Sequence, residues 1–320
     1  MAVTKLDKAC ITAIRDCMGT KPKEKILVIT DEVKKDIGSA LHINALKLGH
    51  ESVLVEIKAR EMHGEEPPKV IAEFMKNFDV VLVPTQKSMT HTNARRNASA
   101  LGVRVATFPG ITEEVMIKGL SADYKKIAAR TIKLKKVFES TKIVRVTAPN
   151  GTDITMDISG RTAFASKGLF HKKGESGNLP TGETFAAPIE GKSDGIFVVD
   201  GSMSGVGIIE EPIKIEVIKG YAEKISGGKQ AKNLISILDK YGRKARNIAE
   251  FGVGTNDKAK LTGELLLDEK VMGTIHIALG DNKSMGGKVN VPIHLDGVIK
   301  KPTVYFDGKV IMKSGKLLIV

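Results

Sequence analysis

The chain has 320 residues, 42% of them apolar, and no apolar run reaches the roughly 18 residues of a membrane-spanning helix. This length is enough for two domains with separate cores, and we expect no membrane partner. The 50 Lys and Arg exceed the 37 Asp and Glu, giving a formal charge of +13. The basic residues are scattered, however, and with 10 Phe, 4 Tyr and no Trp for base stacking we expect no nucleic-acid partner.

The first half of the chain alternates helix-like and strand-like segments. Residues 1–8 lack the apolar core of a signal peptide, which predicts a cytoplasmic protein. Helices are predicted over residues 4–18, 32–48, 68–78, 90–101 and 112–138, and strands over 25–30, 52–57, 79–84 and 104–108. This order is typical of a doubly wound, mostly parallel sheet covered on both faces. No Gly-x-Gly-x-x-Gly follows the first strand, so dinucleotide binding is not supported.

The segment from Ser88 to Arg95 enters the fourth predicted helix just after a strand end. Ligands of such sheets bind at the carboxyl ends of the strands, here the loops at residues 30–31 and 84–88. His91 and Arg95 lie about one helical turn apart. Helix capping explains Ser88 or Thr90 without any function, and we predict His91 and Arg95 as cleft residues.

From residue 141 onward the pattern changes to short strands and frequent glycine. Strands are predicted over residues 143–147, 153–157, 195–200, 213–217, 303–308 and 309–312, with one helix over 228–241. We therefore predict a Rossmann-like α/β domain over residues 1–140. A C-terminal α+β domain, rich in antiparallel or mixed strands, is predicted over residues 141–320.

Five potential metal ligands fall in this second domain, each near Gly, Pro or Asn. His294 and Asp296 lie two residues apart on one predicted strand, so their side chains share a face. His276 lies in another strand-like segment, and Glu183 and Glu250 lie in Gly-containing segments farther upstream. Imidazole with carboxylate suits Zn, Co, Mn or Fe better than Mg or Ca. Because five side chains exceed what one tetrahedral zinc needs, we predict two divalent ions with a bridging carboxylate and water.

Several segments that carry these residues resemble the thermophilic metalloprotease family of aminopeptidases, of the aminopeptidase T and aminopeptidase S type. They span residues 178–188, 249–256, 268–280 and 294–296, and residues 88–95 extend the resemblance into the first half. The resemblance implies ligand roles for the same five residues, a site holding two divalent ions (Zn, Co or Mn), and a homodimer. It also implies a hydrolase that removes N-terminal residues from peptide substrates.

Lys283 departs from that family pattern. It stands seven residues after His276, where aminopeptidases of the family usually carry a Tyr that is thought to assist the tetrahedral intermediate. We predict that Lys283, if it reaches the cleft, donates to the developing oxyanion. Glu183 or Glu250 is the candidate general base if it is not a tight metal ligand.

Two further hypotheses use the same residues differently. His276, His294 and Asp296 match the composition of a two-His-one-carboxylate triad for non-haem Fe(II), which leaves three positions for dioxygen and an aromatic substrate. Relatives of this fold that open dihydroxypyridine rings are similar in this respect, so a ring-cleaving dioxygenase is the second hypothesis. A metal-stabilised binding protein for acidic ligands is the third.

Overall fold

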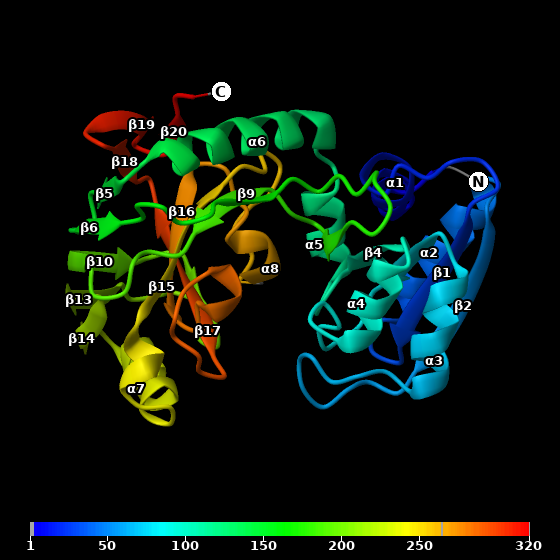
Figure 1. The fold of residues 1–320 in the computed structure, drawn as a ribbon, viewed down its shortest axis with the longest axis horizontal. Coiled ribbons are helices and arrows are strands. Elements are labelled where there is room, and N and C mark those ends of the chain that lie inside the picture. Colours follow the sequence, from blue (N-terminus) through cyan, green and yellow to red (C-terminus); the bar gives the residue numbers. More distant parts are fainter. Residues whose placement is uncertain (1–2, 264, 320) are drawn as a thin grey trace. The chain divides into compact units, whose positions relative to one another are not determined.

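The computed structural model describes residues 3–263 and 265–319, which divide into two compact units (Figure 1). Unit 1 comprises Met1–Ala128 and Gly168–Thr181, and unit 2 comprises Ala129–Lys167 and Gly182–Val320. The division falls inside helix α6 (Tyr124–Ser140), whereas the sequence analysis places the domain boundary at the end of that helix. None of the described helices is long and apolar enough to cross a membrane.

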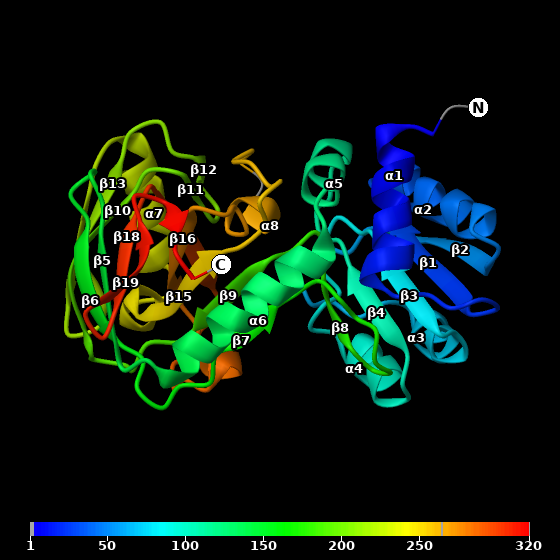
Figure 2. The same ribbon diagram turned by 90° about the horizontal axis from the view of Figure 1, so that it is seen from above.

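Unit 1 is built on a five-stranded parallel sheet in the order β2-β1-β3-β4-β8. Its strands are β1 (Lys25–Asp31), β2 (Glu51–Ile57), β3 (Val80–Val83), β4 (Arg104–Thr107) and β8 (Ser176–Asn178). Its helices are α1 (Lys5–Ile11), η1 (Thr12–Cys17), α2 (Lys35–Lys47), α3 (Lys69–Phe74), η2 (Met75–Asn77), α4 (Asn93–Ala100) and α5 (Glu113–Gly119). Figure 2 shows the sheet between α1 and α2 on one face and α3 and α4 on the other. The predicted parallel α/β architecture is confirmed.

The central strands β1 and β3 form because their side chains are mostly apolar on both faces. Residues 26–29 of β1 and 80–83 of β3 are buried, as expected for strands covered by helices on both sides. Helix α2 approaches β1 closely at Gly38, where an added Cβ would lie 2.6 Å from the Cβ of Thr30. Glycine at this position therefore sets the spacing between the helix and the sheet.

Two elements of unit 1 differ from the prediction. The helix predicted over residues 112–138 is interrupted, because α5 ends at Gly119 and α6 begins at Tyr124. Asp123 explains the restart, since its carboxylate accepts hydrogen bonds from the backbone N–H groups of Lys125 and Lys126 and so caps α6. Strand β8 was not predicted, because Ser-Gly-Asn carries no apolar pattern.

Unit 2 contains two sheets in which all named strands pair antiparallel. One has the order β14-β13-β10-β6-β5-β18-β19-β20 and the other the order β12-β11-β17-β16-β15-β9-β7. The strands of the first are β5 (Ile143–Thr147), β6 (Asp153–Asp157), β10 (Ser193–Val199), β13 (Ile213–Ile218), β14 (Tyr221–Ser226), β18 (Thr303–Phe306), β19 (Lys309–Lys313) and β20 (Lys316–Leu317). Those of the second are β7 (Phe164–Ser166), β9 (Glu183–Ala186), β11 (Ser202–Met203), β12 (Gly207–Ile208), β15 (Ile248–Gly254), β16 (Thr274–Gly280) and β17 (His294–Lys300). Besides the part of α6 from residue 129 onward, the helices are α7 (Lys229–Asp239), η3 (Arg243–Arg246), α8 (Leu265–Asp268) and η4 (Lys283–Met285). The predicted antiparallel, β-rich character of this part is confirmed.

One apolar core joins the two sheets of unit 2. It includes Phe197 from the first sheet and Phe251 and Ile277 from the second. Phe138 of α6 stacks on Phe251 with ring centroids 5.5 Å apart and meets Phe306 edge-on at 4.9 Å. Because side chains alternate along a strand, residues next to Phe251 and Ile277 face away from this core.

Candidate metal centre

Four adjacent strands, β17, β16, β15 and β9, carry the five predicted ligands (Figure 1). In the register of the sheet, Ala278 lies opposite both Glu250 and Asp296, and His276 lies opposite Gly252. His294 pairs with Gly280, and Glu183 pairs with Gly254. Residues two apart share a face, so all five ligand side chains project from the side of the sheet opposite the apolar core.

Small residues share this face and leave space for the ligands. An added Cβ at Gly252 would lie 2.0 Å from Nε2 of His276. At Gly254 an added Cβ would lie 2.1 Å from the carbonyl oxygen of Val271. The glycines of β15 therefore admit the imidazole of His276 and the chain segment before β16.

Glu250 is the centre of the cluster. Its Oε1 lies 3.0 Å from Nε2 of His276, and its Oε2 lies 3.3 Å from Nε2 of His294. Oδ1 of Asp296 lies 3.4 Å from Nε2 of His294, and Oε2 of Glu183 lies 3.6 Å from Nε2 of His276. Two groups with metal-ligand spacing result, Glu183–Glu250–His276 and Glu250–His294–Asp296, which share Glu250.

The predicted triad of His276, His294 and Asp296 is not one of these groups among the described residues. The strand register explains the difference. Glu250 lies on β15, beside His276 on β16, and its two oxygens reach both histidines. A carboxylate therefore links the two imidazoles.

The donor atoms of the cluster fit a metal ion. Oε2 of Glu183 and Oδ1 of Asp296 are buried and have no hydrogen-bond partner. Buried polar atoms are ordinarily paired, so two unpaired carboxylate oxygens beside two imidazoles indicate a place for a cation. Imidazole and carboxylate donors suit a divalent transition metal.

The cluster strongly perturbs its own pKa values. Burial lowers the pKa of His276, but Glu250, Glu183 and Asp296 more than reverse this and raise it to about 9. Burial opposes the charged form of Asp296 as well, yet His294 and His276 hold the pKa of its carboxyl well below the usual range. Burial lowers the pKa of His294 too, but Asp296 and Glu250 raise it overall. Protons therefore compete with an ion for both imidazoles.

Lys270 belongs to the centre although the sequence analysis did not select it. Its side chain is 4% exposed, and its Nζ donates to Oε1 of Glu183 at 2.6 Å and to the carboxylate of Glu269. Burial lowers its pKa, but these two carboxylates raise it overall. Glu183 is thus anchored through one oxygen while the other faces His276. The only sequence signal was a lysine inside the motif at residues 268–280.

The remaining predicted site residues lie elsewhere. Lys283 is exposed on η4, and its backbone N–H donates to Oδ1 of Asp281. His91 is exposed before α4, and Arg95 on α4 donates to the carbonyl of Thr90 and to Oγ of Ser176. His91 and Arg95 belong to unit 1, whereas the five ligands belong to unit 2. Their role as cleft residues stays a prediction.

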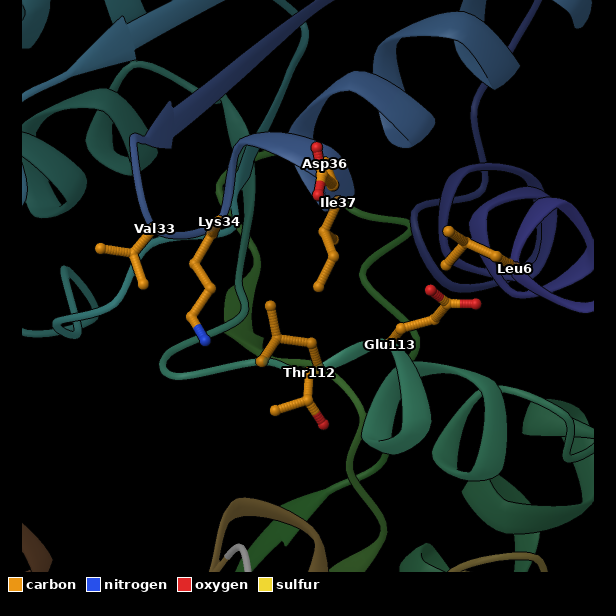
Figure 3. Close-up of a pocket in the computed structure, with 8 residues that line it drawn as sticks. Leu6, Val33, Lys34, Asp36, Ile37, Thr112 and Glu113 are labelled. Atoms are coloured by element: carbon orange, nitrogen blue, oxygen red, sulfur yellow. The ribbon is translucent and has the colours of Figure 1, made fainter.

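Unit 1 has a cavity of its own, of about 200 Å³, at the carboxyl ends of β1 and β4. Figure 3 shows the side chains of Lys34 and Ile37 extending toward the segment that carries Thr112. Nζ of Lys34 donates to the carbonyl of Gly110 at 3.1 Å. None of the predicted site residues lines this cavity. Its lining is Leu6, Val33, Lys34, Asp36, Ile37, Ile111, Thr112 and Glu113.

Known proteins similar to this chain fall into two groups. A family model described as 2,5-dihydroxypyridine 5,6-dioxygenase (NicX) matches residues 6–319. The 2,5-dihydroxypyridine 5,6-dioxygenase of Pseudomonas putida KT2440 is 23% identical over 218 residues, which cover 64% of this chain and 62% of that protein. The chain thus matches less than two thirds of that relative's length.

Two solved structures share the fold. The 2,5-dihydroxypyridine dioxygenase of Pseudomonas putida KT2440 has a TM-score of 0.84 and 18% identity, covering 99% of this chain and 98% of that one. Wild-type AmpT from Thermus thermophilus has a TM-score of 0.70 and 16% identity, covering 98% and 99%. At these identities the structures show a common fold alone.

These comparisons overturn the leading functional prediction. The predicted metal-dependent aminopeptidase, a hydrolase acting on peptides, is wrong, because the family model and the Pseudomonas relative name an oxygenase. The predicted resemblance to aminopeptidase T holds for the fold. The error has a physical cause, since imidazole and carboxylate ligands serve hydrolysis and oxygen chemistry alike. Lys283, in place of the family Tyr, was the departure that pointed away from peptidases.

Proposed function

The chain belongs to the 2,5-dihydroxypyridine 5,6-dioxygenase family, and from this membership we propose that it is a ring-cleaving dioxygenase acting on a dihydroxylated pyridine. The match over residues 6–319 carries the proposal, because it includes every ligand of the candidate metal centre. In the reaction one ring C–C bond breaks, and both atoms of one dioxygen molecule enter the product.

We propose Fe(II) as the metal, held by Glu250, His294 and Asp296. His294 supports this choice, because its side chain is 31% exposed and gives a substrate access, whereas that of His276 is 1% exposed. When bound, Fe(II) would bring dioxygen and the ring hydroxyl together and supply electrons for oxygen activation. Whether the second group, Glu183–Glu250–His276, takes a further ion is decided by measuring metal content.

Glu183 is proposed as the group that accepts a proton from a substrate hydroxyl. Lys270 anchors its Oε1, and its buried Oε2 is without a hydrogen-bond partner. A base needs an unpaired acceptor atom and a fixed position, and Glu183 has both in the group that shares Glu250 with the proposed iron site. His276 shares Glu250 with the proposed iron site and keeps that carboxylate oriented.

Oxygen consumption tests the function directly. Protein stripped of metal and reloaded with Fe(II) without oxygen should consume one dioxygen per 2,5-dihydroxypyridine, with loss of the ring's ultraviolet absorbance. Zn-loaded protein and Asp296→Asn protein serve as controls and should consume none. Unblocked dipeptides should not be cleaved. Absence of oxygen uptake from the Fe(II)-loaded protein with any dihydroxylated pyridine would overturn the proposal.

A further inference from the structure

We propose that Asn282 and Glu190 are positioning residues, which fix the backbone carbonyl that orients the imidazole of His294 toward the metal. The inference rests on the proposed role of His294 as a metal ligand. It concerns the loop between β16 and β17, which lies outside the ligand set.

His294 depends on one hydrogen bond for its orientation. Its Nδ1 lies 2.8 Å from the carbonyl oxygen of Asp281, so the Nδ1–H form donates there and Nε2 keeps its lone pair for an ion. His276 is enclosed by neighbouring side chains, with 1% of its own side chain exposed, but the side chain of His294 is 31% exposed. Packing therefore restrains His294 less, and the carbonyl of Asp281 has to supply the restraint.

Asn282 holds that carbonyl in place from the next residue. Asn282 is fully buried, and its Oδ1 accepts from the N–H of Val289 at 3.0 Å. Its backbone N–H donates to the carbonyl of Val289, and its own carbonyl accepts from the N–H groups of Met285 and Gly287. Asn282 thus connects the two ends of this loop through hydrogen bonds of its side chain and its backbone.

Glu190 fastens this closed loop to the turn between β9 and β10. Its Oε1 accepts from Nδ2 of Asn282 at 2.9 Å and from the N–H of Lys288 at 2.7 Å. Its Oε2 accepts from Nη2 of Arg161 at 2.5 Å. Nη1 of Arg161 donates to the carbonyl of Gly286. Glu190 and Arg161 together therefore hold the loop at Asn282, Gly286 and Lys288. None of these residues reaches the ligand cluster, so the effect passes through the Asp281 carbonyl.

The test measures metal binding rather than turnover. Metal-free protein is titrated with Co(II), whose visible absorption reports both occupancy and ligand geometry. Asn282→Ala and Glu190→Ala should each weaken Co(II) binding about 10- to 100-fold, as is typical for loss of a group behind a metal-bound histidine. Their effects should be less than additive in the double variant, because both variants remove the hydrogen bond between Asn282 and Glu190. The absorption band should also change shape.

Two variants separate positioning from a general loss of structure. Ser284→Ala alters an exposed residue of the same loop and should leave affinity and spectrum unchanged. Glu190→Gln keeps an oxygen for Asn282 and Lys288 and should recover most of the affinity lost in Glu190→Ala. Melting temperatures recorded for every variant show whether the fold is retained.

The outcomes are distinct. Wild-type affinity and spectrum in both Asn282→Ala and Glu190→Ala would overturn this inference alone. Tight Co(II) binding without oxygen uptake in the Fe(II) protein would overturn the proposed function and leave this inference standing. A wild-type chain that binds no Co(II) would overturn both.

Discussion

Lys270 shows how much one side chain contributes to the charge balance of the centre. The cluster contains the carboxylates of Glu183, Glu250, Glu269 and Asp296 in a largely buried space. Burial raises the pKa of Glu269 to about 8, and Asp296 and Glu183 raise it further, although Lys270 lowers it. The ammonium of Lys270 is the countercharge of Glu183 and Glu269, whereas the imidazoles of His276 and His294 lie against Glu250 and Asp296.

Replacing Lys270 by Met should destabilise the metal-free protein by about 3–5 kcal/mol, because it leaves buried carboxylates without their partner. Urea unfolding at neutral pH measures this free energy. Lys283→Met is the matched control, since Lys283 is exposed, and should change stability by no more than about 0.5 kcal/mol. Equal stability of the two variants would show that Lys270 is not the countercharge.

His276 should make metal binding depend on pH. Its pKa is raised from 6.5 to about 9 in the folded, metal-free protein, so its contribution to stability is complete below pH 6.5 and lost as pH rises through about 9. Metal-free protein should therefore become less stable over this interval. Protons compete with the ion, so metal affinity should rise over the same interval. The difference in melting temperature between loaded and metal-free protein should widen with pH. A difference in melting temperature that stays constant with pH would contradict the raised pKa of His276.

The candidate ligands could be selected from sequence, whereas the residues that support them could not. His294 and Asp296 are two residues apart, and period-two alternation places them on one face whatever the rest of the chain does. Glu183 and Glu250 were selected by residue type within Gly-containing segments, and the register of β9 and β15 brings them together. Lys270 carries no such signal, because its position depends on the close approach of its segment to Gly254.

At the scale of elements, the second sheet of unit 2 uses one face for the apolar core and the other face for the candidate metal centre. The apolar face of β15 and β16 joins the core through Phe251 and Ile277, and the other face carries the ligands between small residues. Alternation of this kind was readable in residues 273–280. The break between α5 and α6 was not, since Asp123 looks like a surface residue until its capping bonds are known.

Gly252→Ala should disturb the metal centre more than it disturbs the fold. The new Cβ would lie 2.0 Å from Nε2 of His276, so the imidazole has to move away from Glu250. We expect metal affinity to fall at least tenfold, measured by Co(II) titration. Ala278→Gly on the neighbouring strand adds no atom to the site and should leave affinity unchanged, with about 1 kcal/mol lost in stability. If Gly252→Ala binds Co(II) as tightly as the wild-type chain, the imidazole of His276 does not have to lie beside Glu250 for metal binding.

At the scale of the molecule, each unit has a separate apolar core. One core draws on residues from Leu27 to Val105, and the other on residues from Leu134 to Leu317. The two-part organisation follows from the change of pattern in the sequence, although the exact division inside α6 depends on packing. The predicted homodimer and the absence of a nucleic-acid partner stay predictions.

Metal should stabilise one unit and not the other. All five candidate ligands lie in unit 2, and an ion bound only to the folded form raises stability by mass action. Calorimetry of the full chain should therefore show two transitions, of which only one moves to higher temperature with Fe(II) or Co(II) and back with a chelator. A single transition that moves as a whole would mean that the units unfold together.

Strand β8 has a consequence for the order in which the chain becomes foldable during synthesis. The segment Gly168–Thr181 returns to unit 1 and pairs β8 with β4, which is otherwise the edge of the parallel sheet. A nascent chain that has emerged only to Ser140 lacks this strand and presents β4 as an open edge, a template for intermolecular pairing. A chain truncated after Ser140 should aggregate when expressed, whereas appending residues 168–181 through a flexible linker should keep it in solution. Strand β8 would then protect the nascent chain from aggregation, because it covers the edge of β4 once residues 168–181 have been synthesised.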